Sequence, residues 1–226
     1  MVSQTALHYI HDPLCGWCYG AAPLVAAARL IMTVRAHGGG MMTGGRRQHV
    51  TPQLRQYVMQ HDRRIAQLTG QPFGTAYFDG LLCDASAVFD SEPPITAILA
   101  AEQAHGRGLD MLARIQRAHY VEGRRVADEA VLHALAMDLG LDPATFATAF
   151  EACRGQAVQA HMAASRALLA RVDGAGFPTF VLERGSELTA IDLGPFLGQP
   201  AKWLDWLRAQ TRSLESQPEG GAAFCR

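Results

Sequence analysis

Two cysteines separated by two residues, Cys15 and Cys18, constrain the fold of this chain more than any other feature of its sequence. They follow a predicted strand over residues 6–11 and precede a predicted helix over residues 21–31, which is rich in alanine and leucine. A second predicted strand covers residues 32–37 and contains β-branched side chains. The pattern therefore predicts a β-α-β unit, with both cysteines at the junction between its first strand and its helix.

The rest of the chain divides into a long helical stretch and a second group of strands. Residues 51–173 show repeated helical spacing, and glycines or capping residues followed by proline separate the segments. Residues 177–183 and 188–191 predict two strands joined by a tight turn, and residues 201–211 predict a last helix. This order predicts an α/β fold: one mixed sheet flanked by helices, with a helical block inserted between its two halves.

Composition and charge exclude several classes of protein. Hydrophobic residues make up 49% of the chain, which is enough to bury a full core, and the formal net charge is only −1. A nucleic-acid or anionic-membrane partner usually requires a basic patch, so neither is predicted. The sequence begins with no basic region followed by an apolar one, and its best apolar run, residues 21–32, contains Arg29. We therefore predict a cytoplasmic protein.

The remaining cysteines, Cys83, Cys153 and Cys225, are isolated in the sequence. An odd number of widely spaced cysteines does not match a secreted disulfide scaffold. Zinc normally requires four ligands in two clustered pairs, and no second pair accompanies Cys15 and Cys18. We therefore predict no metal and no other cofactor. Cys83 and Cys153 are expected to be small buried side chains, and Cys225 is expected to be incidental.

The spacing of Cys15 and Cys18 suits thiol–disulfide exchange. This reaction needs one thiolate that attacks a disulfide and a second thiol that resolves the mixed disulfide. A cysteine at the start of a helix faces unpaired backbone N–H groups and the positive end of the helix dipole, which in general favours the thiolate. One turn later, the second thiol lies within reach and is more sheltered. We therefore predict Cys15 as the nucleophile and Cys18 as the resolving thiol.

The segment from His11 to Gly20, HDPLCGWCYG, resembles the active-site segment of the DsbA-like branch of the thioredoxin superfamily. Pro23 stands five residues after Cys18, where the family often has a proline that kinks the helix. Pro178 stands where the family has a cis-proline just before the third strand. The resemblance covers residues 6–211 and is strongest to cytosolic members described as predicted protein-disulfide isomerases.

This resemblance implies a thioredoxin-like fold with an inserted all-helical subdomain, as in DsbA. Residues 1–50 and 174–213 would form the discontinuous thioredoxin-like domain, and residues 51–173 would form the helical insertion. Residues 214–226, which are polar and rich in glycine, are expected to be a flexible tail.

The resemblance also implies roles near the cysteine pair. A cis bond before Pro178 would shape a substrate groove and leave the backbone of Phe177 free to pair with substrate. The Trp17 side chain could face substrate or pack in the core. The Phe177 side chain could likewise line the substrate groove or pack in the core. His11 and Asp12 could tune the thiols or transfer protons, or they could be an ordinary polar pair at the end of a strand.

Three functions remain open from the sequence. The first is a thiol–disulfide oxidoreductase that acts on protein, peptide or small-molecule disulfides; the Gly-Trp dipeptide between its cysteines leaves the direction of electron flow open. The second is a glutathione-dependent transferase or isomerase of the kappa or hydroxychromene-carboxylate type, in which Arg46 and Arg47 could hold an anionic group of glutathione. The third is a non-catalytic binding module. The two retained thiols favour the first, and the oligomeric state is left open.

Overall fold

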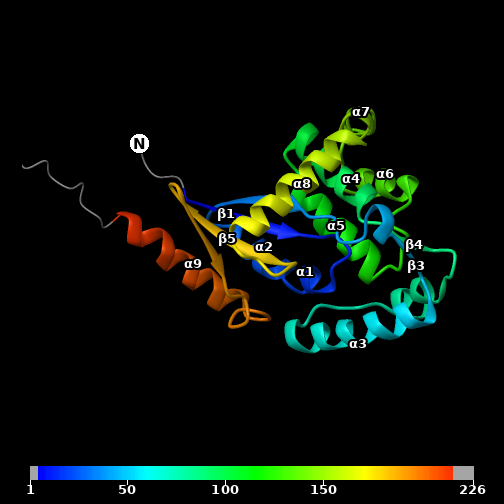
Figure 1. The fold of residues 1–226 in the computed structure, drawn as a ribbon, viewed down its shortest axis with the longest axis horizontal. Coiled ribbons are helices and arrows are strands. Elements are labelled where there is room, and N and C mark those ends of the chain that lie inside the picture. The colour runs from blue at the N-terminus through cyan, green and yellow to red at the C-terminus, as the bar shows by residue number, and fades with distance from the viewer. Residues whose placement is uncertain (1–4, 216–226) are drawn as a thin grey trace, which may run out of the picture.

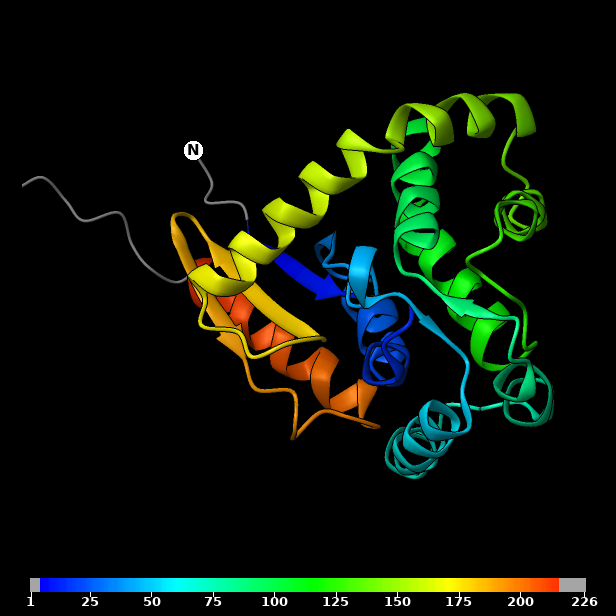
Figure 2. The same ribbon diagram turned by 45° about the vertical axis from the view of Figure 1, so that its right-hand side comes forward.

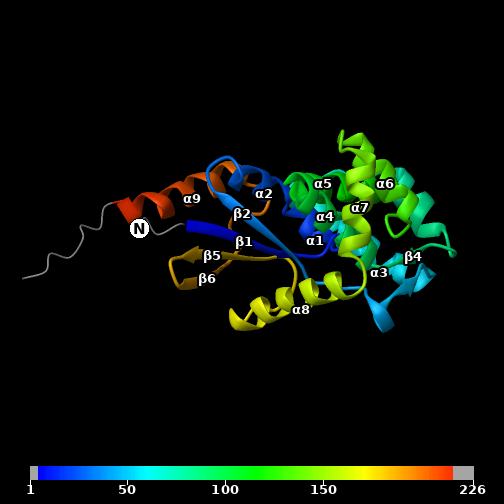
Figure 3. The ribbon, with the colours of Figure 1, turned by 90° about the horizontal axis from the view of Figure 1, so that it is seen from above.

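A four-stranded mixed sheet forms the centre of the computed structural model, which describes residues 5–215 (Figure 1). Its strands are β1 (Thr5–His11), β2 (Thr33–Gly38), β5 (Thr179–Arg184) and β6 (Glu187–Ile191). They lie in the order β2-β1-β5-β6, as seen from above in Figure 3. β2 runs parallel to β1, whereas β5 and β6 are antiparallel neighbours. The predicted β-α-β and β-β-α halves therefore meet in one sheet.

The central strand β1 is buried on both faces because helices cover both sides of the sheet. Alternate residues point to opposite faces of a strand, yet every residue from Ala6 to His11 is buried. Tyr9 lies opposite Phe180 of β5, and their rings pack 4.7 Å apart. This buried strand leads directly into the cysteine pair and so fixes the position of the cysteine turn in the fold.

One face of the sheet is covered by α1 (Gly16–Gly20), α2 (Ala22–Ala28) and α9 (Pro200–Glu215), and α8 (Gln156–Arg171) lies on the other (Figure 3). The indole N–H of Trp203 donates a hydrogen bond to the backbone carbonyl of Leu24, 2.9 Å away. Trp203 is completely buried, so the aromatic side of the last helix belongs to the core. The predicted helix over residues 21–31 is confirmed as the shorter α2, and α1, which precedes it at the cysteine pair, is a separate short helix that was not predicted.

A group of longer helices, shown in cyan and green in Figure 2, lies beyond one end of the sheet, and the yellow helix α8 runs from this group back over the sheet. They are α3 (Pro52–Thr69), α4 (Glu92–His105), α5 (Gly108–Tyr120), α6 (Glu129–Asp138), α7 (Pro143–Cys153) and α8 (Gln156–Arg171). The side chains of Thr51 and Asp142 cap α3 and α7, because each accepts a hydrogen bond from a backbone N–H in the first turn. The predicted α/β fold with helices between its two halves is confirmed.

The helix α8 connects the helical group to the sheet. The Gly38 N–H at the end of β2 donates to His161 Nε2 of α8 at 3.0 Å. Farther along α8, the Arg166 side chain donates to the carbonyl of Gly39 at 2.7 Å. Because α8 packs on β2 as well as on α4 and α7, the domain boundary near residue 173 stays a prediction.

Two details differ from the sequence prediction. A second, two-stranded sheet pairs β3 (Gln48–His49) with β4 (Val88–Phe89), which are too short for a periodic pattern to reveal. The prediction that Cys83 is buried is wrong: it ends a short 3-10 turn at the surface, and its side chain is exposed. The prediction that Cys153 is buried is confirmed. Cys225 and residues 216–226 of the predicted tail lie outside the described residues.

Among the residues that the structure describes, no helix is both long enough and apolar enough to cross a membrane.

Candidate active site

Cys15 stands at the N-cap of α1, in an extended conformation. Its Sγ atom accepts a hydrogen bond from the Cys18 N–H at 3.4 Å and donates one to the carbonyl of Phe177, also at 3.4 Å. The side chain is only 6% exposed. The predicted nucleophile is therefore held between the start of α1 and the segment that enters β5, 162 residues later in the chain.

Cys18 is the more sheltered of the two thiols and is completely buried. Burial, and next the hydrogen bond with Cys15, raises its pKa well above the ordinary value for a thiol. Its Sγ atom lies 3.5 Å from the backbone nitrogen of Asp12, whose N–H points toward it. The Tyr9 hydroxyl donates to the Cys18 carbonyl at 3.1 Å and fixes the inner side of α1. The two thiols thus have the unequal surroundings that an attacking and a resolving thiol require.

The peptide bond between Phe177 and Pro178 is cis, which confirms the prediction for this position. The turn brings the Phe177 carbonyl to the Cys15 thiol. The tip of the Phe177 ring packs against Gly39, where any side-chain Cβ would overlap it. Phe177 is half-buried and touches the core, so it contributes both to the core and to the rim of the site.

Asp12 is completely buried directly behind the cysteine pair. Its Oδ1 atom accepts from the Leu14 N–H and from the Ser91 hydroxyl, both at 2.9 Å, and Oδ2 accepts from the Met41 N–H. Burial raises the pKa of this carboxyl, and the three hydrogen bonds oppose the rise. Asp12 therefore connects the cysteine turn to the loop after β2 and to the start of α4.

His11 is buried beside Asp12, and its ring stacks on Tyr9 at a distance of 4.9 Å. Neither ring nitrogen makes a hydrogen bond to any residue from 5 to 215. Burial lowers the pKa of His11 to about 3, so the ring is neutral at physiological pH. Of the two predicted modulators, Asp12 is hydrogen-bonded to the cysteine turn, whereas the His11 ring stacks on Tyr9 and makes no hydrogen bond to the described residues.

Trp17 is half-buried between the two cysteines and packs against the core, which leaves part of its ring available at the surface. Arg46 and Arg47 lie on an exposed loop. Arg46 donates to the Gly40 carbonyl, and Arg47 forms an ion pair with Asp90 at 2.8 Å. The structure therefore gathers Trp17 and Phe177 at the cysteine pair, and it engages both arginines within the protein.

A carboxyl group that the sequence analysis missed lies against the cysteine turn. Asp62 of α3 is 4% exposed, and its Oδ1 atom occupies the space that a Cβ on Gly16 would need. Burial raises the pKa of Asp62 to about 7, although the Tyr77 hydroxyl donates to its Oδ2 atom at 2.8 Å. The signal in the sequence is an aspartate spaced between Val58 and Ile65 on the inner face of a helix.

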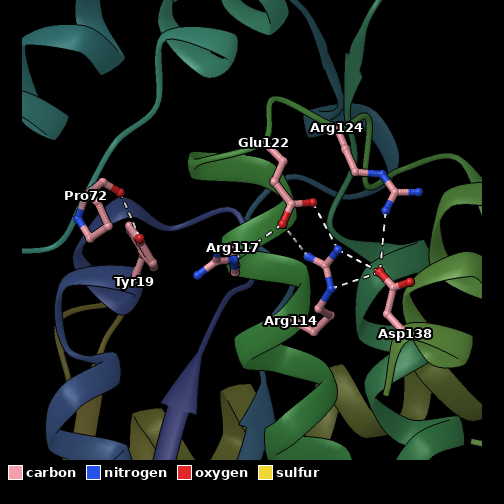
Figure 4. A network of polar contacts seen from close by, with 7 residues as sticks. All are labelled: Tyr19, Pro72, Arg114, Arg117, Glu122, Arg124 and Asp138. Carbon is pink, nitrogen blue, oxygen red and sulfur yellow. Dashed lines mark hydrogen bonds and ion pairs between the residues drawn. The ribbon is translucent and has the colours of Figure 1, made fainter. Parts of the chain in front are cut away.

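Aromatic rings complete the inner wall of the site. Tyr120 stacks on Tyr19 at 4.8 Å, and the Tyr120 hydroxyl is buried without a hydrogen-bond partner among the described residues. The Tyr19 hydroxyl donates to the Pro72 carbonyl at 2.8 Å (Figure 4). Burial raises the pKa of Tyr19 to about 12. These contacts hold α1 against the helical group through groups that are neutral at physiological pH.

Within residues 5–215, no cluster of three or more His, Cys, Asp or Glu side chains has the geometry to hold a metal ion. Cys15 and Cys18 both carry free thiols at this junction.

Comparisons with known proteins agree with this geometry. Residues 9–194 match the model of the DSBA-like thioredoxin domain. The structure is similar to the cytosolic disulfide reductase DsbM from Pseudomonas aeruginosa, with 60% sequence identity over 92% of this chain and 99% of that one and a TM-score of 0.87. A second structure of that reductase, with GSH, gives 58% identity, the same coverage and a TM-score of 0.85.

A more distant similarity concerns the fold alone. A 2-hydroxychromene-2-carboxylate isomerase shares 17% identity over 93% of this chain and 100% of its own, with a TM-score of 0.58. Comparison with curated proteins gives no significant match. The match to the family model, which covers most of the chain, and the 60% identity to DsbM show that the chain belongs to the family of DSBA-like thioredoxin-domain proteins.

Proposed function

We propose that this thiol–disulfide oxidoreductase works in the cytoplasm as a reductase of disulfides in proteins, peptides or small molecules, with glutathione as its reductant. The observation that carries the proposal is the contrast between the two thiols. Cys15 is positioned between the start of α1 and the carbonyl of Phe177, while Cys18 is completely buried and its pKa is raised. The name of the similar reductase supports the direction, and its structure with GSH supports the choice of reductant.

The reaction would proceed by two exchanges. The Cys15 thiolate attacks one sulfur of the substrate disulfide, and the other sulfur leaves as a thiolate. Cys18 then loses its proton to the solvent and attacks the Cys15 sulfur, which releases the second substrate thiolate and leaves a Cys15–Cys18 disulfide. The substrate gains two electrons. Two glutathione molecules would then reduce the enzyme and become glutathione disulfide.

The surrounding residues would position the substrate. The backbone of Phe177 before the cis-proline lies beside Cys15, where it could pair with an extended substrate or with the peptide bonds of glutathione. The half-buried rings of Trp17 and Phe177 would pack on the substrate from two sides. Asp12 is a positioning residue in this proposal, because its N–H points toward the Cys18 sulfur.

The test is reduction of insulin and of hydroxyethyl disulfide with glutathione, recycled by glutathione reductase and NADPH. We expect Cys15→Ser to lower turnover by on the order of 10³-fold or more, since the covalent step is lost. Cys18→Ser should accumulate a mixed disulfide with insulin, which mass spectrometry detects. Equal activity of both variants and wild type would contradict the role of the pair.

The direction of electron flow is tested by measuring the reduction potential of the Cys15–Cys18 pair in glutathione buffers. A reductase supplied by glutathione should have a potential close to that of the cytosolic glutathione pool, about −220 to −260 mV, because glutathione could not reduce a pair of much lower potential; a value near about −120 mV would mark an oxidant. The transferase alternative predicts instead that Cys18→Ser keeps full glutathione-dependent activity toward an electrophile.

A further inference from the structure

A groove of about 400 Å³ runs along the outer edge of β2. One wall is β2 itself, from Thr33 to Gly38, and the opposite wall comes from α4 and the start of α5. His11 and His161 close the end nearest the cysteine pair, but neither Cys15 nor Cys18 lines it. We refer to this space between β2 and α4 as the β2-edge groove.

The backbone of β2 presents free peptide groups to this groove. Gly39 N–H donates to the His11 carbonyl of β1, whereas Gly38 N–H points the other way and donates to His161. Because backbone groups alternate in direction along a strand, Val34 and Ala36 share the outward direction of Gly38. Within the described residues β2 has a strand neighbour, β1, on one side, so no strand accepts from these two outward N–H groups. β2 is therefore an edge strand with an open ladder position.

Aliphatic side chains of α4 form part of the wall opposite β2. Ile98 and Leu99 of α4 line it, and Ile95 packs on Gly38 so tightly that a Cβ there would overlap it. The groove therefore offers hydrogen-bonding groups on one side and aliphatic side chains on the other. An extended chain meets both requirements, because its backbone pairs sideways while its side chains point away from the ladder.

The charges around the groove argue against a charged ligand. Each charged side chain that lines the groove has a partner within the protein. Arg29 pairs with Asp110 at 2.7 Å, Arg35 pairs with Glu183 at 2.6 Å, and Glu102 accepts from the Gly108 N–H at 2.9 Å. What the groove offers a ligand is neutral: peptide groups of β2 and the ring of His11.

His11 is an independent sign that the groove receives a hydrogen-bonding ligand. Its side chain is 1% exposed and lines the inner end of the groove, yet both ring nitrogens lack a partner among the described residues. A buried polar atom without a partner destabilises the folded protein, because it has lost its hydrogen bonds to water. A ligand that donates to or accepts from this ring would recover the lost hydrogen bond.

We propose that the β2-edge groove binds an extended, uncharged segment of polypeptide, which adds to the sheet as a fifth strand beside β2. Its backbone pairs with the outward N–H and C=O groups of Val34 and Ala36. Its apolar side chains contact Ile98 and Leu99, and its end reaches the ring of His11. Binding needs no thiol chemistry and is separate from disulfide reduction.

The test uses a cysteine-free probe, the peptide acetyl-Ala-Val-Thr-Val-Ala-amide, and the same peptide with N-methylated backbone nitrogens as its matched control. Nuclear magnetic resonance follows amide hydrogen exchange in the whole protein. The unmodified peptide should slow exchange of the Val34 and Ala36 amides by about tenfold. Exchange of the Arg35 amide, whose N–H points toward β1, should not change. The methylated peptide should have no effect, because its methyl groups replace the donors to the β2 carbonyls and keep its backbone from approaching the strand.

Two protein variants keep the result decisive. Ala36→Pro removes an outward N–H and leaves the β1 ladder intact, so it should weaken peptide binding by about tenfold or more. Leu99→Arg places a charge in the groove without altering the strand and should have a similar effect, which covers the case in which the proline variant fails to fold. Both should reduce hydroxyethyl disulfide at the wild-type rate.

The proposal is overturned if the peptide leaves the exchange of Val34 and Ala36 unchanged, or if both variants bind it as tightly as wild type. It is also overturned if the same amides become protected without peptide as protein concentration rises, because the occupant would then be a second copy of this chain.

Discussion

The sheet region contributes the thiols of the candidate site, whereas the helical region contributes buried polar groups around them. The sheet region, comprising β1, α1, α2, β2, β5, β6 and α9, holds the two thiols and the cis-proline turn within hydrogen-bond distance. The helical region, α3 to α7, brings Asp62 and Tyr120 behind α1 but no thiol. The comparison shows that reacting atoms come from one short segment, whereas their electrostatic surroundings come from distant parts of the chain.

The two regions also differ in how they use charge. Behind the cysteines, polar groups are buried and mostly neutral, as the raised pKa of Asp62 indicates. At the surface of the helical region, Arg114 bridges Glu122 and Asp138 in the network of Figure 4. Exposed ion pairs stabilise proteins little, whereas a buried carboxyl is sensitive to every neighbour. Four tests separate these contributions.

The largest expected effect tests whether the core of the helical region is independent of the chemistry. Phe146 of α7 is completely buried. Phe146→Ala should lower the free energy of unfolding by about 3–5 kcal/mol, because it removes a large side chain and leaves a cavity. Turnover per folded molecule and the reduction potential should stay at wild-type values. Urea unfolding measures the free energy of unfolding, with Phe146→Leu as the milder control. A changed potential would show that the two regions are coupled.

The second test concerns Asp62. Its pKa is raised to about 7 in the folded protein, so the folded state holds a proton that the unfolded state releases near pH 4. Stability conferred by this group is therefore lost as pH rises from about 4 to 7, with a slope of at most about 1.4 kcal/mol per pH unit. Asp62→Asn should remove that slope. Unfolding curves at several pH values measure it, and an unchanged slope would assign it to other groups.

The same substitution should change the pH profile of disulfide reduction. Above about pH 7, ionised Asp62 places a negative charge beside Gly16, and this charge opposes the one that develops on the Cys15 sulfur. Asp62→Asn should therefore react faster than wild type above pH 7 and similarly below it. A uniform change at all pH values would indicate a structural effect instead.

The third test addresses the contact between α1 and α3. A methyl group on residue 16 would overlap Asp62 Oδ1, so Gly16→Ala should lower the free energy of unfolding by about 1–3 kcal/mol. Asp62→Ala clears the space, and the double variant should recover most of the loss attributed to the clash. Strict additivity in the double-mutant cycle would mean that the two residues do not compete for this space.

The smallest effect is expected at the surface network of the helical region. Arg114→Met should lower the free energy of unfolding by about 1 kcal/mol or less, and the loss should shrink in high salt. Arg208→Met, which breaks an exposed pair with Asp205 in the sheet region, is the matched control and should change stability even less. Neither should alter turnover. A larger, salt-independent loss at Arg114 would show that its aliphatic stem matters more than its charge.

The sequence alone predicted the features that depend on neighbouring residues. The cysteine pair at a strand-to-helix junction, the strands on either side of it and the helices between the two halves follow from local periodicity and turn chemistry. The cis bond before Pro178 could be predicted because the resemblance placed that proline before the third strand. Short apolar patterns missed β3 and β4, since two-residue strands carry no period.

Only the tertiary structure decided which distant side chains meet at the site. Ser91 reaches Asp12 across 79 positions, and Asp62 meets Gly16 although nothing near either residue indicates the contact. The exposure of Cys83 and the open edge of β2 were equally invisible. The physical reason is that local propensity sets where a helix or strand begins and ends, whereas burial and hydrogen-bond partners depend on how those elements pack.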